Sequence, residues 1–237
     1  MAVNFQPVYI LASGGERALE QLSTATNNIS NANTTGFKKL LVREMSQKIP
    51  ENLPPASDLF VFPRFMDSPT LNKQGNLIKT DNPLDVAIEG DGFFTVETGV
   101  GRLYTRNGHF NISSDGFLVT SSGGYLLDEN GNRIRVNQNG RIDITREGFI
   151  YQDGQQIGKL RVVNLQNLSH VGDSYYTGQE SPAGNFKINQ GYLENSNVEI
   201  VKEMVNLINS HRRFDIYMNL VKSLDMLEGK VNDIGKA

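Results

Sequence analysis

Small and apolar residues recur along the start of the chain at alternating steps of three and four positions. The run extends from Pro7 to about Asn33 and holds this spacing for nearly four heptads, which is typical of a helix that packs along one face. Such a helix needs a packing partner, because isolated helices gain most of their stability from tertiary contacts. The predicted seam consists of Val8, Leu11, Gly15, Ala18, Leu22, Ala25, Ile29 and Ala32.

A second helical pattern spans Asn195 to Asp233. Ser196 followed by Glu199 predicts a capping box at its start, in which each side chain accepts a backbone N–H of the other residue. Two long amphipathic helices at opposite ends of a chain are natural partners for each other. The predicted apolar stripe of this helix includes Val198, Val201, Val205, Ile208, Phe214, Val221 and Leu224.

Turn dipeptides recur through the middle of the chain every six to nine residues, with short β-prone runs such as Phe93 to Val96 between them. This spacing predicts short antiparallel strands from about Leu84 to Lys187. The proline-rich segment from Glu51 to Asp81 predicts an irregular connector. The turn dipeptides are Asn107-Gly108, Asp115-Gly116, Gly123-Gly124, Asn130-Gly131, Asn139-Gly140, Glu147-Gly148 and Asp153-Gly154.

These patterns predict a mainly β protein with two long terminal α-helices. The helices would form a discontinuous coiled-coil domain, and the middle of the chain a central antiparallel all-β domain. The expected boundaries are 1–36 for the N-terminal helix, 37–83 for an extended connector, 84–190 for the β domain and 191–237 for the C-terminal helix.

Composition narrows the function classes. The 237 residues include 23 basic and 26 acidic side chains, for a net charge of −3. The sequence contains no block of like charges that would indicate a surface for binding nucleic acid or lipid. No cysteine is present, which excludes disulfides and thiolate chemistry. The N-terminal sequence lacks the basic region of a cleavable signal, and no apolar stretch has the length of a membrane span.

Motifs that suggest chemistry are incomplete. Gly90-Asp91-Gly92 opens like a dinucleotide fingerprint but lacks the third glycine and the following helix, so we predict a hairpin turn. Asp128, Asn130 and Asn132 resemble the start of a calcium loop without its glycine and bidentate glutamate. The histidines His109, His170 and His211 are scattered. We therefore predict no enzyme activity and no catalytic, cofactor or metal site.

The pattern alone leaves two arrangements of the helices open. They could form a hairpin within one subunit, or their apolar faces could be covered by neighbouring copies. Repeated heterologous contacts of the second kind build open helical filaments.

Four stretches of the sequence carry a resemblance. The segments 25–39, 82–96, 104–110 and 193–205 are similar, in order, to signatures of bacterial flagellar rod and hook proteins. They include Ala-Asn-Thr-Thr-Gly-Phe-Lys-Lys, Ile-Glu-Gly-Asp-Gly-Phe-Phe, Tyr-Thr-Arg-Asn-Gly-His-Phe and Leu-Glu-Asn-Ser-Asn-Val-Glu. The motif residues singled out are Asn27, Asn28, Asn31, Asn33, Thr34, Thr35, Gly36, Phe37, Ser196, Asn197 and Val198.

The resemblance implies a structural subunit of the flagellar basal-body rod, the axial shaft that transmits torque to the hook and encloses the export channel. Its terminal helices would form the inner tube and its β domain an outer layer. The implied partners are further copies, other rod proteins, rod-cap and ring proteins, and the flagellar type III export apparatus. No nucleic acid, small-molecule substrate or membrane insertion is implied. The implied location is the periplasmic rod, reached without a cleaved signal peptide.

Two finer expectations follow from the sequence. The length of 237 residues and the segment from His211 to Phe214 favour a proximal position in the rod over a distal one. An adaptor that docks one rod or ring partner through its β domain is the alternative function. We also expect the asparagines of the first motif to cap or bridge helices, and Gly36 to end the first helix in a left-handed turn.

Overall fold

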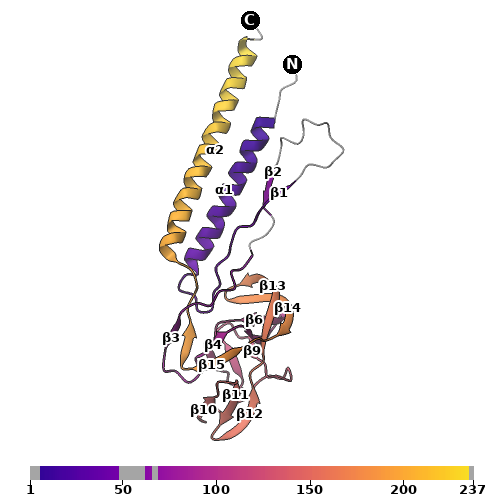
Figure 1. The fold of residues 1–237 in the computed structure, drawn as a ribbon, viewed down its shortest axis with the longest axis vertical. Helices are drawn as coiled ribbons and strands as arrows, with labels where there is room; N and C mark the ends of the chain where they lie inside the picture. The colour runs from indigo at the N-terminus through magenta and orange to yellow at the C-terminus, as the bar shows by residue number, and fades with distance from the viewer. Residues whose placement is uncertain (1–5, 48–61, 66–68, 235–237) are drawn as a thin grey trace. The chain divides into compact units, whose positions relative to one another are not determined.

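The computed structural model describes residues 6–47, 62–65 and 69–234, arranged in two compact units (Figure 1). Each unit is discontinuous in sequence. The helical unit comprises Met1–Ser30, Leu40–Pro69 and Glu199–Ala237, and the β unit comprises Asn31–Lys39 and Thr70–Val198. The predicted fold class, mainly β with two long terminal helices, is confirmed.

The helical unit is built on two antiparallel helices that lie side by side, α1 (Gln6–Ser30) and α2 (Ile200–Ile234) (Figure 1). Their direction follows from the contacts, since Gly14 meets Tyr217 near one end and Asn28 meets Glu203 near the other. Strands β1 (Glu44–Gln47) and β2 (Phe62–Phe65) form an antiparallel pair, and β2 packs against α1.

The helix ends differ from those predicted. Because α2 begins at Ile200, Glu199 lies just outside the helix and cannot take the interior place that a capping box requires. The Ser196 hydroxyl instead accepts the N–H of Val198 at 3.3 Å, as in a local turn. The first helix ends at Ser30, six residues before Gly36, so the prediction that Gly36 ends this helix is wrong.

The β unit consists of fourteen short strands in the described segments, most of them three to six residues long. Their bounds are β3 Leu77–Lys79, β4 Val86–Gly90, β5 Phe93–Thr98, β6 Gly101–Thr105, β7 Phe110–Ile112, β8 Leu118–Thr120, β9 Tyr125–Leu126, β10 Ile142–Ile144, β11 Phe149–Gln152, β12 Gln155–Lys159, β13 Val162–Gly172, β14 Tyr175–Pro182, β15 Phe186–Gln190 and β16 Tyr192–Glu194.

The largest sheet has seven strands in the order β13-β14-β6-β5-β9-β8-β7, and β13 also pairs with β5. Strands β13, β14, β6 and β5 therefore close on themselves. The register places Phe94 opposite both Thr105 of β6 and Val162 of β13. The remaining strands form a three-stranded sheet, β10-β11-β12, and the pairs β15-β4 and β16-β3.

The hairpin predicted at Gly90-Asp91-Gly92 is not formed. The turn connects β4 to β5, but β4 pairs with β15 while β5 belongs to the seven-stranded sheet. At Gly90 a Cβ would lie 2.4 Å from the carbonyl oxygen of Asn185, so the close approach of the chain that enters β15 requires glycine. By contrast, Asp153 and Gly154 both have positive φ and join the paired strands β11 and β12, as the turn signal predicts.

One sequence-remote strand pair extends the β unit beyond the segment expected to hold it. Strand β3 lies within the predicted connector and β16 within the predicted C-terminal helix, yet they pair with Tyr192 opposite Lys79. The main apolar core includes Val86, Phe94 and Ile150. A second cluster, centred on Phe93 and Tyr176, lies among the four closed strands.

Candidate functional site

The predicted seam of α1 faces α2 within the same chain. Gly15, Ala18 and Ala25 are buried, as is the neighbouring Gly14, and the larger members are half-buried. These half-buried members are Leu11, Leu22, Ile29 and, just beyond the helix, Ala32; the side chain of Val8 lies outside the described part. Small residues on this face let the second helix approach closely.

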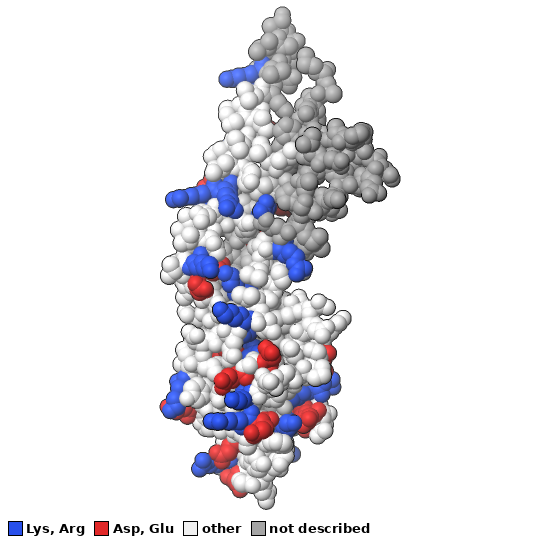
Figure 2. All heavy atoms as spheres, in the orientation of Figure 1, with Lys and Arg blue, Asp and Glu red and all other residues white. Residues whose placement is uncertain are grey.

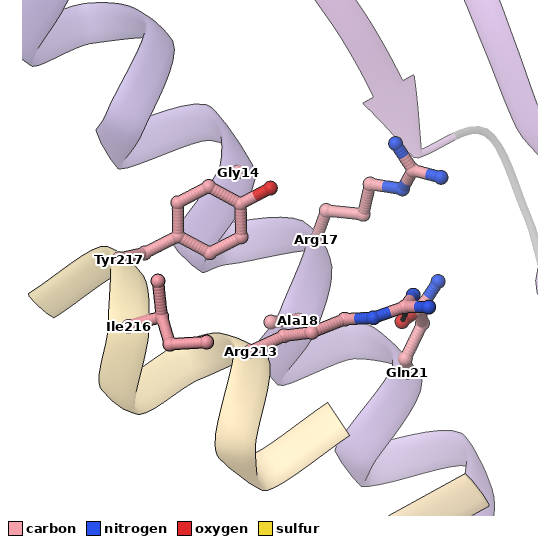
Figure 3. A pocket seen from close by; sticks show the side chains of 7 residues that line it. All are labelled: Gly14, Arg17, Ala18, Gln21, Arg213, Ile216 and Tyr217. Atoms are coloured by element: carbon pink, nitrogen blue, oxygen red, sulfur yellow. Dashed lines mark hydrogen bonds between the residues drawn. The ribbon is translucent and has the colours of Figure 1, made fainter. Parts of the chain in front are cut away.

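The closest approach is at Gly14, where the ring of Tyr217 lies across α1 (Figure 3). A Cβ at Gly14 would lie 2.5 Å from the ring of Tyr217, whereas one at Gly15 would meet its nearest atom at 3.8 Å. A shallow groove of about 290 Å³ runs beside this contact, and Arg213 extends across it to donate to the Gln21 side chain at 3.5 Å (Figure 3).

The face that α2 turns to α1 differs in part from the predicted stripe. Glu203 and Ser210 are buried, and the other members of this inner face are half-buried, at alternating steps of four and three. The predicted stripe contains Phe214, Val221 and Leu224 of this face but not its first half, where Glu203 and Ser210 interrupt the apolar pattern. The inner face comprises Glu203, Leu207, Ser210, Phe214, Tyr217, Val221 and Leu224.

The predicted positions that do not face α1 form a second stripe along α2, which we call the outer stripe. Val201, Val205 and Ile208 are 76%, 52% and 49% exposed in the single chain. Met204 and Ile216 lie on the same side of α2 as these three residues and are also exposed. Phe214, Val221 and Leu224 of the predicted stripe belong to the inner face instead, and Val198 precedes the helix, half-buried in the β unit.

Asn28 supplies the most specific polar contact of the helical unit. Its side-chain oxygen accepts the N–H of Leu40 at 2.8 Å, and its amide nitrogen donates to the Leu40 carbonyl at 2.9 Å. The same amide donates to the buried Glu203 carboxylate at 3.3 Å. One buried amide thus ties α1 both to the returning chain and to α2. Asn27 lies exposed on the same helix.

Residues from the family-like stretches meet Tyr176 inside the β unit, at a cluster that we call the motif junction: Lys38, Arg106, Tyr176, Glu194 and Asn197. The ammonium of Lys38 and the guanidinium of Arg106 both contact the Glu194 carboxylate, Arg106 at 3.0 Å. All three side chains are buried. Burial lowers the pKa of Lys38, and the Glu194 charge opposes that shift.

Arg106 also anchors the turn that follows β4. Its guanidinium donates to the carbonyls of Ile88 at 3.2 Å and Gly90 at 2.6 Å, and it lies 5.2 Å from the centre of the Phe93 ring. Each of the four stretches quoted above therefore contributes to one cluster in the β unit. The remaining motif residues belong to the two chain segments that enter the motif junction. Half-buried among them are Asn31, Thr34, Thr35 and Ser196, and Asn33 is exposed.

The histidines take part in local contacts. His109 lies 2.6 Å from the Asp85 carboxylate, His211 pairs with Asp215 on α2, and a His170 ring nitrogen lies 2.8 Å from the Asp173 carbonyl. Within the described ranges, no three potential ligands gather in a way that would hold a metal. None of the described helices is long and apolar enough to cross a membrane. Acidic and basic side chains are interspersed over the face in Figure 2.

Comparisons with known families match this arrangement segment by segment. The family described as flagella basal body rod protein matches residues 9–38, which cover most of α1 and the first motif. The family described as flagellar hook protein FlgE/F/G D1 domain matches residues 87–154 of the β unit. The family described as flagellar basal body rod FlgEFG protein C-terminal matches residues 189–234, including α2.

Relatives are similar over almost the whole chain. A flagellar basal-body rod protein FlgG of Agrobacterium fabrum is 32% identical over 94% of this chain and 97% of its own length. A FlgF of Caulobacter vibrioides is 33% identical over 91% of this chain and 92% of its own. The chain belongs to the flagellar basal-body rod protein family. It is a FlgF- or FlgG-type structural protein of the basal body and interacts with other rod components.

Proposed function

We propose that this chain polymerises through its terminal helices with further copies and other rod proteins into the axial shaft of the basal body. The shaft transmits torque from the motor to the hook and encloses the export channel. The observation that carries this proposal is the outer stripe of α2, which stays exposed after α1 has covered the inner face. An exposed contiguous apolar surface of this kind marks a protein contact.

The physical reason is that α2 has more apolar surface than one partner helix can cover. Fully burying one valine or isoleucine side chain stabilises by about 1.5–3 kcal/mol, so packing Val201, Val205 and Ile208 against neighbouring helices provides a substantial driving force. In this proposal the outer stripe packs on a different surface of the neighbouring subunit, so the contact is heterologous. Repeated contacts of this type generate a filament.

The alternative, an adaptor that docks one rod or ring partner through its β unit, has weaker support. The exposed large apolar residues described in the β unit are Ile78, Val100, Ile157 and Val171, which lie in separate strands and turns. They do not follow a common strand or face in the way that the outer stripe follows α2.

Chain length favours the proximal position in the rod, which the resemblance assigns to FlgF, over the distal position, which it assigns to FlgG. The alignments with the FlgG proteins of Agrobacterium fabrum and Bacillus subtilis run to 258 positions, more than the 237 residues of this chain, so these relatives contain insertions. Those with the FlgF proteins of Caulobacter vibrioides and Rhizobium meliloti run to 230 and 217 positions. We therefore propose a FlgF-type, non-enzymatic subunit.

The proposal also covers how the chain reaches the rod. The chain would leave the cytoplasm through the flagellar type III export apparatus and contact rod-cap and ring proteins in the periplasm. Electron microscopy of basal bodies from a strain that lacks this gene tests the function. We expect rods that stop close to the inner-membrane ring. Full-length rods would contradict the proposal, and rods truncated only near the outer membrane would indicate the distal position.

A further inference from the structure

The segment Asn31–Lys39 enters the β unit as a separate piece of chain. It leaves the helical unit after Ser30 and returns to it at Leu40, while the rest of the β unit begins only at Thr70. The segment contributes no named strand to the sheets of that unit. Its place in the β unit therefore depends on the contacts that Thr70–Val198 makes with it.

Backbone groups of Gly36, Lys38 and Lys39 make these contacts. The N–H of Gly36 donates to the Glu194 carbonyl at 2.8 Å, and that of Lys38 donates to the Tyr176 hydroxyl at 2.7 Å. The N–H of Lys39 donates to the Asn197 side chain at 2.7 Å, while its carbonyl accepts the N–H of Leu71 at 2.8 Å. Main-chain hydrogen bonds of this kind provide affinity where a domain binds a peptide.

The side chains of the segment meet matching surroundings. Phe37 is fully buried, with its ring 5.4 Å from His170 in an edge-on contact. The ammonium of Lys38 is held by the Glu194 carboxylate and by the Lys73 carbonyl at 2.9 Å. A buried site beside the His170 ring, followed by a buried carboxylate, suits phenylalanine and then lysine.

Glycine is required at the preceding position for two reasons. Gly36 has a φ of +72°, a conformation that other residues rarely adopt. A Cβ there would also lie 2.3 Å from the backbone nitrogen of Asn107. The β unit thus distinguishes three successive residues, Gly36, Phe37 and Lys38, by backbone, shape and charge.

We propose that the β unit carries a peptide-recognition site for the sequence Gly-Phe-Lys, which the chain fills with its own residues 36–38. The segment is a detachable ligand of the site rather than a permanent part of the β core. Once the chain's own segment is withdrawn, the site binds the same peptide supplied from another molecule, for which a second copy of the chain is a source. This property does not depend on the proposed position in the rod.

The test uses the full chain with the double substitution F37A/K38M, which weakens its own segment, and a labelled synthetic peptide of residues 31–39. We expect this variant to bind the peptide at least tenfold more tightly than the unaltered chain, whose site is filled. A K38M peptide should bind at least tenfold more weakly, and adding E194Q to the chain should abolish binding. A folded variant that binds neither peptide, or both equally, would overturn the proposal.

Hydrogen exchange keeps the test decisive if the variant does not fold. In the unaltered chain we expect the amides of Gly36, Lys38 and Lys39 to exchange by a local opening, with exchange at least tenfold faster than that of Phe94 in β5. Exchange of all four amides only in a common global unfolding event would show that the segment does not detach, and would overturn the proposal.

Discussion

The side chains of Lys38 and Glu194 form a buried ion pair across 156 positions of sequence, and Arg106 bonds to the second oxygen of the same carboxylate. One carboxylate therefore serves two cations. The lysine and the glutamate are not equally important to this cluster. Removing the lysine leaves a neutral pair, whereas removing the glutamate leaves two buried positive charges. This asymmetry makes the motif junction testable by substitution.

Glu194→Gln should destabilise the β unit far more than Lys38→Met. We expect a loss of about 3–5 kcal/mol for Glu194→Gln, because breaking a buried pair leaves uncompensated charge. For Lys38→Met we expect about 1–2 kcal/mol from the lost hydrogen bonds. Urea unfolding followed by tyrosine fluorescence measures both values.

Glu97→Gln is the matched control for this comparison, since Glu97 forms an exposed ion pair with Arg133. It should cost under about 1 kcal/mol, as exposed pairs do. The double substitution K38M/E194Q should be more stable than E194Q alone. If E194Q and K38M cost the same, the electrostatic account of the junction is incorrect.

Adjacent glycines on α1 give a sharp test of the helix contact. Gly15→Ala should stabilise the helical unit by about 0.5–1 kcal/mol, because alanine has the higher helix propensity and the site has room. Gly14→Ala should be less stable than Gly15→Ala by about 1–3 kcal/mol, since its methyl group overlaps the Tyr217 ring. Thermal unfolding followed by circular dichroism at 222 nm distinguishes them. Equal stability of the two variants would mean that Tyr217 does not pack on Gly14.

Asn28→Asp should destabilise the helical unit by about 2–4 kcal/mol. The carboxylate can no longer donate to the Leu40 carbonyl, and it faces the buried Glu203 carboxylate. Asn33→Asp adds the same charge at an exposed position and should change the free energy of unfolding by less than about 0.5 kcal/mol. Similar urea midpoints for the two variants would argue against the buried role of Asn28.

The Tyr104–Glu180 pair predicts a dependence on alkaline pH. Burial and the hydrogen bond to Glu180 raise the pKa of Tyr104 from 10.0 to about 12. Between these values the unfolded chain loses the phenolic proton while the folded chain keeps it, so stability falls as pH rises. Tyr104→Phe should reduce the slope of unfolding free energy against pH between about 10 and 12. An unchanged slope would contradict the assignment.

The sequence was sufficient for the elements whose signals are local. The α1 seam at Gly15, Ala18 and Ala25 and the turn at Asp153-Gly154 follow from periodicity and turn chemistry, and the structure has both. The ends of the helices were less accurate, because a capping pattern such as Ser196 and Glu199 also suits a turn before the helix.

Long-range pairing could not be derived in the same way. Nothing local to Lys38 indicates that it is buried, because its partners Arg106 and Glu194 lie far along the chain. Likewise, the strand that pairs with β4 is β15 rather than the adjacent β5, so the glycine turn at Gly90 gave a misleading hairpin signal. The first half of the inner face of α2 was missed because Glu203 and Ser210 interrupt its apolar pattern.

Charged substitutions test assembly only at helix positions that do not pack within the subunit. Leu22 and Ile29 face α2 within the same chain, so a charge there disturbs the subunit itself. Val205 and Ile208 lie on the outer stripe, where a charge leaves the helix pair intact. Asn209 is exposed on the flank of α2, and Asn209→Asp is the matched control.

The most direct measurement of the proposed polymerisation is the amount of each variant in purified basal bodies from a strain that lacks the native gene. We expect V205D/I208D to be exported and to keep the helix content of the unaltered chain, yet to be absent from basal bodies, with loss of motility. N209D should be incorporated normally. Normal incorporation of V205D/I208D would contradict the central claim that the outer stripe of α2 assembles the rod.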